Sequence, residues 1–185
     1  FNGGIHPDDN KKLSCNSAIE QMPITGSVVI PLSQHLGKPA LSTVKVGDYV
    51  ELGQLIAKSD GLLSANIHSS VAGTVEYIEQ RPHPVAGFGD AIIIKPDNTK
   101  SQEYKLPTKR DWRGLSAEDI KYKISAAGIV GLGGATFPTI VKLSPPQGKV
   151  IDSIIINGVE CEPYLTADYR LMLEQTAAII EGAQI

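Results

Sequence analysis

The hydrophobic pattern changes from strand-like to helix-like along the chain. Between residues 23 and 97, short apolar runs bounded by glycines recur at intervals of about 8 to 12 residues, a spacing typical of small β-sandwiches and barrels. Val28–Leu32 and Ala91–Ile94 are the clearest of these runs. After Ser116, apolar residues return every three or four positions, which indicates helix. The pattern therefore predicts a β part followed by a part that contains helices.

Two helix boundaries can be placed from local signals. Ser116–Asp119 resembles a capping box, with Asp in the position where Glu or Gln is usual. Gly128 suits the end of the helix that begins there. We expect a second, short helix after Pro138, because proline is favoured at the first helical position, and this helix carries Lys142.

The last third of the chain predicts a strand and a helix. Val150–Ile156 is a nearly continuous β-branched run, which indicates a buried parallel strand. A helix is expected over residues 166–181, with Thr166 as its N-cap. Its core face comprises Leu171, Met172, Leu173, Ile179 and Ile180. Helix, strand and helix in this order favour an α/β arrangement.

These patterns divide the chain into four segments. We expect an N-terminal arm over residues 1–22, a β barrel-sandwich module over 23–97, a polar linker over 98–114, and an incomplete α/β domain over 115–185. The expected fold class is α+β in several parts. We expect this chain to be an excised piece of a longer protein, because it begins at Phe1 and ends at Ile185 inside a helical pattern.

Composition narrows the classes of function. The chain has 185 residues, 42% of them hydrophobic and 20% charged, which is ordinary for a folded domain. The net charge of −3 and the absence of a basic stripe argue against nucleic acid as a partner. The apolar runs are too short to span a bilayer, and no signal peptide is recognised.

The two cysteines, Cys15 and Cys161, lie far apart in sequence. They form no disulfide framework and no C-x-x-C pair, so we expect a reducing compartment and no iron–sulfur cluster within these residues. Cys161 is interpreted as structural, because no cation lies near it in sequence to activate the thiol. The histidines have no metal-ligand spacing and are expected at the surface or in turns: His6, His35, His68 and His83.

The β part resembles a carrier module without its prosthetic arm. Val44–Val50 and Ser69–Val75 resemble the two halves of a biotinyl/lipoyl-type barrel-sandwich. In true carriers a lysine at a hairpin tip holds the prosthetic group, and Gly61 stands at that position here. Lys58 precedes Asp60 instead of following it. We therefore favour a structural or docking module over a modified carrier.

The glycine-dense segment Gly128–Thr139 is the first candidate for ligand chemistry. Four glycines in seven positions allow positive φ and close approach of a ligand, and consecutive N–H groups in such a loop form an anion-binding nest. Lys142 would add a full positive charge. The spacing is neither a Rossmann fingerprint nor a Walker loop. A tight connection between two helices is the alternative.

The acidic segment Asn157–Pro163 is the second candidate. It follows the predicted strand Val150–Ile156, at the carboxyl end where α/β sheets place ligands. Asn157, Glu160 and Glu162 would be costly to bury without partners. The alternative is a solvated loop that caps the next helix.

Together the two segments resemble a known family. Gly131–Thr139 with Lys142 is similar to the flavin loop of the NADH-oxidising, FMN-binding subunit of respiratory complex I, and Asn157–Pro163 is similar to the acidic segment of that protein. Gly158–Arg170 and Gly3–Pro7 are closer still to the RnfC family, a component of the Rnf electron-transport complex. The resemblance spans nearly the whole chain.

Four positions depart from the complex I pattern. Arg is common where Leu132 stands, Gly where Thr136 stands, Asp where Val159 stands, and Ser where Cys161 stands. A cation and a hydrogen-bond acceptor are therefore missing. The departures imply that flavin binding is weaker or differently oriented than in complex I.

The resemblance implies a redox function. The RnfC protein would transfer electrons between NAD(H) and iron–sulfur centres or ferredoxin through FMN, as part of an NAD:ferredoxin-type oxidoreductase that couples this transfer to ion translocation. Two [4Fe–4S] clusters are expected beyond Ile185. The other Rnf subunits, membrane-embedded and ferredoxin-like, are the expected partners, and the cytoplasmic side of the bacterial inner membrane is the expected peripheral location. These 185 residues alone are expected to be inactive and to bind FMN poorly.

The resemblance also implies the residues that bind the cofactors, while no catalytic side chain and no metal site are expected. The expected cofactor-binding residues are Gly131, Gly133, Gly134, Ala135, Phe137, Lys142, Asn157, Glu160 and Glu162. The glycine-loop backbone would border the flavin and Phe137 would face the nicotinamide. Lys142 and Asn157 would hydrogen-bond the flavin, and the two glutamates would orient flavin or nucleotide groups.

Two other functions stay open. One is a non-catalytic scaffold whose β module docks membrane partners. The other is a flavin subunit of a soluble NAD-reducing hydrogenase or formate dehydrogenase, which uses the same flavin fold. Two C-x-x-C-x-x-C-x-x-x-C-P runs downstream would favour Rnf over the latter.

Overall fold

The computed structural model describes residues 3–24, 26–103, 111–132 and 134–185. The chain forms two compact units: residues 23–147 make one, and residues 1–22 together with 148–185 make the other.

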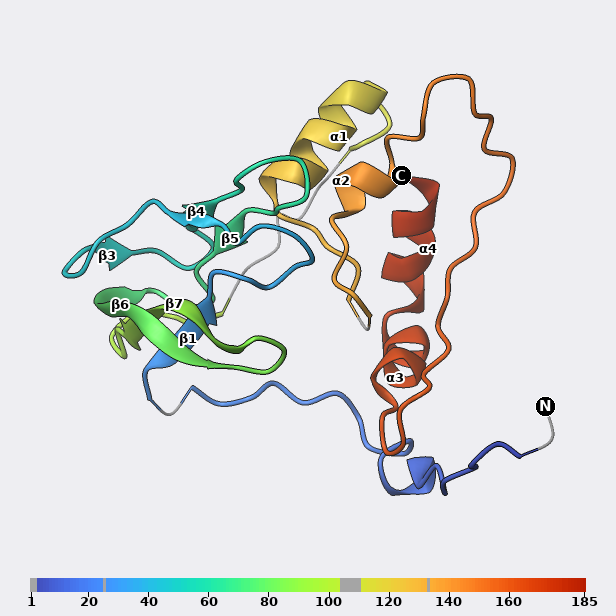
Figure 1. Ribbon diagram of the computed structural model, residues 1–185, viewed down its shortest axis with the longest axis horizontal. Coiled ribbons are helices and arrows are strands. Elements are labelled where there is room, and N and C mark those ends of the chain that lie inside the picture. Colours follow the sequence, from blue (N-terminus) through green and yellow to red (C-terminus); the bar gives the residue numbers. More distant parts are fainter. Residues whose placement is uncertain (1–2, 25, 104–110, 133) are drawn as a thin grey trace. The chain divides into compact units, whose positions relative to one another are not determined.

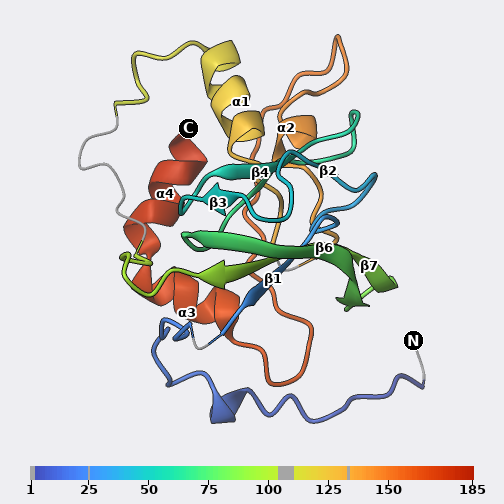
Figure 2. The ribbon, with the colours of Figure 1, turned by 90° about the vertical axis from the view of Figure 1, so that its left-hand side faces the viewer.

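Two antiparallel sheets make up the β part of the first unit (Figure 1). The strands are β1 (Val28–Pro31), β2 (Leu41–Ser42), β3 (Tyr49–Val50), β4 (Leu55–Lys58), β5 (Ile67–His68), β6 (Gly73–His83) and β7 (Gly87–Pro96). One sheet has the order β1-β7-β6-β3 and the other β2-β4-β5. Figure 2 shows β1 beside the long β6 and β7 ribbons.

The two sheets share one hydrophobic core. Ile92 and Ile94 of β7 and Val50 of β3 come from the larger sheet, Ile56 of β4 comes from the smaller one, and all four side chains are fully buried. Ile30 of β1 pairs with Ile92 and joins the same core. Burial of these β-branched side chains from two sheets confirms the β module expected from the short apolar runs bounded by glycines.

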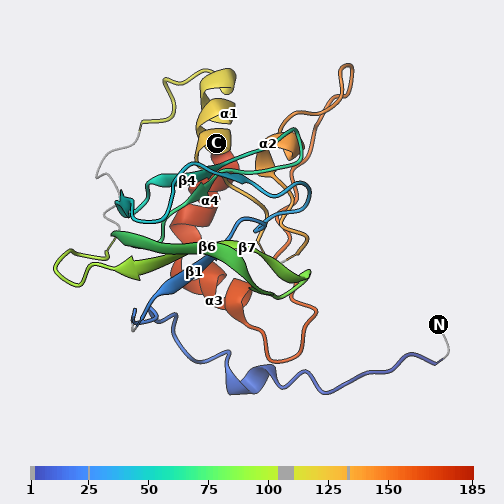
Figure 3. The same ribbon diagram turned by 60° about the vertical axis from the view of Figure 1, so that its left-hand side comes forward.

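Two strands are longer than the sequence predicted. β6 and β7 form one extended hairpin (Figure 3), whereas short strands separated by turns were expected. Gly73 lies in this ladder, where a Cβ would come within 2.1 Å of the carbonyl oxygen of Lys95. This glycine therefore serves close strand packing and not a turn.

Gly61 has φ +99° in the loop after β4. L-residues rarely adopt this conformation, so the backbone itself disfavours a lysine at the position that carries the prosthetic group in true carriers. A carrier function of the β module is thus opposed by backbone geometry as well as by residue type.

The first unit also contains α1 (Ala117–Ala126) and α2 (Thr139–Lys142). The capping box is confirmed: the Ser116 hydroxyl accepts the backbone N–H of Asp119, and the Asp119 carboxylate accepts the backbone N–H of Ser116. Gly128 has φ +66° just after α1, as expected for a helix stop.

Residues 111–147 pack with the β module. The Asn66 side-chain amide donates to the carbonyl of Ala126 at the end of α1, over 3.2 Å. The backbone N–H of Leu36 donates to the carbonyl of Thr136, also over 3.2 Å. The packing units therefore divide the chain near residue 147, while the domain ranges drawn from the sequence stay a prediction.

The second unit contains a 3-10 helix, η1 (Lys11–Leu13), and the helices α3 (Ala167–Glu174) and α4 (Thr176–Gln184). The prediction of one continuous helix is wrong, because Gln175, with φ −125° and ψ 30°, breaks it. Thr166 does precede α3, but its hydroxyl makes no capping hydrogen bond to the helix.

The predicted strand Val150–Ile156 is wrong for this structure. The segment has no regular secondary structure, and the side chains of Val150 and Ile155 are 91% and 89% exposed. The expected core face of the last helix is also largely exposed, as at Leu173. A strand needs a neighbour to complete its hydrogen-bond ladder, and none of the described residues pairs with this run.

Candidate functional site

The glycine loop is a closed, hairpin-like turn. Val130 and Pro138 form an antiparallel bridge at its base. Just inside the bridge, the backbone N–H of Gly131 donates to the carbonyl of Phe137 over 2.9 Å. Gly131 can therefore border a ligand only through its Cα and carbonyl, because its N–H is already satisfied.

Positive φ occurs at Gly128, where this segment begins, but not at the described glycines further along the loop. Neither Gly131 nor Gly134 has positive φ, whereas Thr136 has φ +50°. This is an uncommon conformation for a β-branched residue. The Thr136 carbonyl accepts the Leu36 N–H, which ties the turn to the β module. Gly133 lies outside the described residues.

Lys142 places a cation against the loop. A Cβ on Gly131 would lie 2.6 Å from the Lys142 ammonium nitrogen, so the missing side chain leaves the space that the ammonium occupies. Lys142 is exposed at the end of α2, which has only four residues. The positive charge at this loop therefore comes from a lysine more than from a helix terminus.

The loop borders a hollow of about 580 Å³ on the first unit. One wall is Gly134–Thr136, and the opposite walls are residues 33–37 and the hairpin tip around Val85. His83 fixes that tip: its Nε2 donates to the Ser33 carbonyl over 2.8 Å, and its Nδ1 accepts the N–H of Val85 over 3.2 Å. Gly134 and Ala135 are exposed and Phe137 is half-buried.

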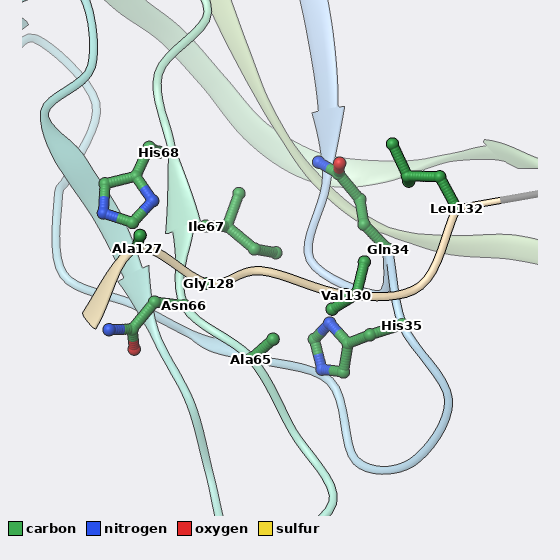
Figure 4. A pocket seen from close by; sticks show the side chains of 10 residues that line it. All are labelled: Gln34, His35, Ala65, Asn66, Ile67, His68, Ala127, Gly128, Val130 and Leu132. Atoms are coloured by element: carbon green, nitrogen blue, oxygen red, sulfur yellow. The ribbon is translucent and has the colours of Figure 1, made fainter. Parts of the chain in front are cut away.

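A smaller hollow of about 200 Å³ lies where the glycine segment begins (Figure 4). Asn66, His68 and His35 contribute side chains to it. Burial lowers the pKa of His68 below 6.5. His35 lies in a bend, but it is buried and not at the surface, and its Nε2 lies 3.1 Å from the hydroxyl of Ser64.

In the acidic loop Glu160 has a structural partner. Its carboxylate accepts the backbone N–H groups of Asp168 over 2.9 Å and Tyr169 over 3.2 Å, and so caps the start of α3. These bonds, the one from Asp168 foremost, lower the pKa of Glu160 below 4.5, and the nearby Lys11 ammonium acts in the same direction. Glu160 thus performs the capping that the alternative interpretation of this loop described.

Asn157 and Glu162 remain outward-facing. The Asn157 side-chain oxygen accepts the N–H of Val159 over 3.0 Å, which leaves its NH₂ group available to a ligand. Glu162 is exposed and has no hydrogen-bond or ionic partner among the described residues. Cys161 is exposed as well.

The chemical types of the side chains at the two loops suit a phosphorylated flavin. A lysine and a hollow beside a glycine turn suit a phosphate or a ring edge, and an amide donor with a free carboxylate suits the polar edge of a ring or a ribose. The loops belong to different packing units, so their meeting around one ligand stays a prediction.

The residues that hold the acidic loop were not predicted from the sequence. Lys11 and Ser14, in the N-terminal arm, donate hydrogen bonds to the carbonyls of Glu160, Tyr164 and Leu165. The contacts join positions about 150 residues apart. No local pattern in the arm signals them; the resemblance at Gly3–Pro7 was the only sign that this segment mattered.

Metal ligation and membrane crossing find no support in the part of the chain that the structure describes. No three His, Cys, Asp or Glu side chains of the described ranges are grouped in a way that could hold a metal ion. Among the same residues, every helix falls short of the length and apolar character that a bilayer crossing requires.

Two families of known domains match this chain. Residues 1–99 match the RnfC barrel sandwich hybrid domain, and residues 124–185 match the Nuo51 FMN-binding domain. This is a protein in which a barrel-sandwich module precedes a flavin-binding domain. More narrowly, the chain belongs to the RnfC family of the Rnf complexes.

Relatives span the whole chain. The chain is 51% identical to the C subunit of the proton-translocating ferredoxin:NAD(+) oxidoreductase complex of Clostridium ljungdahlii over 185 residues, which is 40% of that protein's length. It is 39% identical to the Na(+)-translocating counterpart of Acetobacterium woodii, of which it covers 42%. Identity to the corresponding protein of the ion-translocating oxidoreductase complex of Rhodobacter capsulatus is 44%, over 36% of its length. The chain thus spans about two fifths of these relatives.

Proposed function

We propose that this chain supplies the FMN-binding loops of a protein of an ion-translocating ferredoxin:NAD(+) oxidoreductase complex, through which electrons pass between NAD(H) and iron–sulfur centres. The observation that carries the proposal is that both loops lie within residues 124–185, the span that matches the FMN-binding domain. At the two loops the side chains of Lys142 and Glu162 are exposed to solvent and therefore accessible.

The glycine loop supplies a small-residue surface and one cation. Gly134 and Ala135 border the flavin on the side of the hollow, and Lys142 neutralises negative charge beside Gly131. Phe137 offers an aromatic face to the nicotinamide. The Leu36–Thr136 hydrogen bond makes the β module a support for this turn.

The acidic loop supplies polar contacts. Asn157 donates its amide to the flavin, and Glu162 orients a hydroxyl or ring N–H of flavin or nucleotide. Because the Glu160 carboxylate is held by the amides of α3, we assign Glu160 to positioning the loop and not to contacting the ligand.

Bound FMN supplies the redox chemistry, since a flavin takes up two electrons with a hydride and passes them on singly. The chain's residues bind and orient it. Hydride transfer needs no general base, so no side chain of this chain is assigned that role.

We place the remaining parts of the electron-transfer pathway outside these 185 residues. Relatives are more than twice as long as this chain, and we place the two [4Fe–4S] clusters and the remaining walls of the pocket in that further length. Val150–Ile156 and the apolar face of α3 and α4 are exposed here, and we propose that the remaining walls of the pocket cover them. We propose peripheral attachment at the cytoplasmic side of the membrane through the other subunits of the complex.

FMN titration of the full-length protein tests the proposal. Wild type is expected to bind FMN. Gly134→Val should bind FMN at least about tenfold more weakly, because the added side chain blocks the hollow, and Glu162→Gln should bind it several-fold more weakly. Gly114→Val and Glu103→Gln, at exposed positions outside both loops, are the matched controls. If both loop variants retain wild-type affinity, the site assignment fails and the scaffold function gains weight.

A further inference from the structure

The N-terminal arm is fastened to the acidic loop through backbone groups. The Lys11 ammonium donates to the carbonyls of Glu160 over 2.8 Å and Leu165 over 2.9 Å. The Ser14 hydroxyl donates to the carbonyl of Tyr164 over 2.7 Å. Three carbonyls of a loop without regular structure thus find their donors in side chains of the arm.

The loop conformation depends on these contacts. Tyr164 has φ +68°, an uncommon value for a residue other than glycine, and its N–H donates to the carbonyl of Asp9 over 2.7 Å. The Thr166 hydroxyl donates to that of Ser14 over 3.0 Å. A left-handed residue at this point is held in place by hydrogen bonds on both its N–H and its carbonyl.

A second set of contacts continues the arm along α3. Arg170 donates to the carbonyl of Cys15 over 3.2 Å, and the Glu174 carboxylate accepts the N–H of Ile19 over 3.1 Å. Arg170 and Glu174 are also paired with each other one helical turn apart. The arm therefore holds both the loop and the helix whose first turn the Glu160 carboxylate caps.

We propose that the N-terminal arm is a clamp for the acidic loop, and that Lys11 is a positioning residue for the ligand that this loop binds. Lys11 touches no ligand in this assignment. It fixes the backbone carbonyls of Glu160 and Leu165. The Glu160 carboxylate then stays bonded to the first N–H groups of α3, while Asn157 and Glu162 face outward. The role of Lys11 in ligand binding rests on the proposed FMN function, whereas its hold on the loop does not.

The chain offers matched variants for a test in the full-length protein. Lys11→Met removes both charge-assisted donors, Lys11→Arg retains them, and Ser14→Ala removes the third donor. Lys12→Met changes the neighbouring lysine, which is exposed and has no partner in the described part of the chain. FMN affinity and amide hydrogen exchange of residues 160–169 are measured for each.

We expect Lys11→Met to weaken FMN binding about tenfold and to speed exchange at Tyr164, Asp168 and Tyr169. Ser14→Ala should show the same changes to a smaller extent, and it decides the matter if Lys11→Met does not fold. Lys11→Arg keeps the positive charge and the donors, and should therefore retain most of the affinity and the slow exchange. Lys12→Met should match wild type.

Wild-type FMN affinity in Lys11→Met and Ser14→Ala would overturn the proposed role, even if exchange is faster. Weaker binding with unchanged exchange in residues 160–169 would overturn it too, because the loop would not be the route. If wild type itself binds no FMN, the proposed function fails. The clamp is then judged on exchange alone, and unchanged exchange in Lys11→Met refutes it.

Discussion

The carboxylate of Glu160 accepts the backbone N–H of Asp168 over 2.9 Å, across eight residues of chain. The first N–H groups of a helix have no partner within the helix, and a negative charge there is favoured. This one contact joins the acidic loop to α3 and gives an acidic residue of the candidate site a structural task.

Glu160→Gln should therefore destabilise the protein in a pH-dependent way. The folded-state pKa of Glu160 is below 4.5, so its contribution is fully present above that pH and is lost as pH falls through the folded value. We expect a lower unfolding temperature for the variant at pH 7, and a difference from wild type that narrows below about pH 4.5. Glu162→Gln, an exposed neighbour, is the control. Equal pH profiles for Glu160→Gln and wild type would contradict the capping role.

Gly128 lies directly against the β module. A Cβ there would lie 2.0 Å from the carbonyl oxygen of Asn66, and φ is +66°. We expect Gly128→Ala to cost about 3 kcal/mol of unfolding free energy, from clash and backbone strain together. Gly87→Ala has a similar φ of +75° but open space, and should cost only about 1 kcal/mol. Denaturant unfolding of both variants measures the difference, and equal costs would exclude the clash.

The contrast between Ser116 and Glu160 shows how far sequence reasoning extends. The Ser116–Asp119 box was predictable because its partners are three residues apart on one helical turn. The Glu160 cap was not assigned, because acceptor and donor lie eight positions apart in the chain and an irregular loop joins them. The Lys11 contacts to the same loop span about 150 residues, and periodicity carries no information on such pairs.

Apolar runs were predicted correctly only where a neighbour completes them. Val28–Leu32 contains β1, and its Ile30 pairs with Ile92 in a shared core. Val150–Ile156 has an equally strong β-branched pattern but pairs with none of the described residues, so it stays exposed. A strand is a property of two segments, and the pattern of one cannot supply the other.

Asn66 joins the β module to the end of α1 through both ends of its side chain. The oxygen accepts the N–H of Ser59 over 2.9 Å, and the amide nitrogen donates to the carbonyl of Ala126 over 3.2 Å. Asn66→Ala should lose about 2 kcal/mol of unfolding free energy. Asn66→Asp keeps the acceptor but sets a negative charge against the Ala126 carbonyl, and should lose at least as much. Wild-type stability of Asn66→Asp, measured by chemical denaturation, would show that the second bond contributes nothing.

Ser116 stabilises α1 through its N-terminal cap, which lies outside both candidate ligand-binding loops. Ser116→Ala removes the acceptor for the Asp119 N–H and should lower the unfolding free energy by about 1 kcal/mol. Ser116→Thr retains the hydroxyl and should lose little. Thermal unfolding checks both variants. An unchanged unfolding midpoint for Ser116→Ala would show that the cap does not contribute to the stability of the protein.

Gly131 offers a variant in which ligand binding and stability are expected to separate. An added methyl group would meet the Lys142 ammonium at 2.6 Å, the far end of a flexible side chain, and φ is not positive. Gly131→Ala should therefore change unfolding free energy by less than about 0.5 kcal/mol while moving the cation off the loop. We expect several-fold weaker FMN binding by the full-length protein, with Gly114→Ala unchanged. Lys142→Met should weaken binding to the same extent, and adding it to Gly131→Ala should cost little more, because both changes remove one contact. Additive losses in the double variant would show that Gly131 acts on the ligand independently of Lys142.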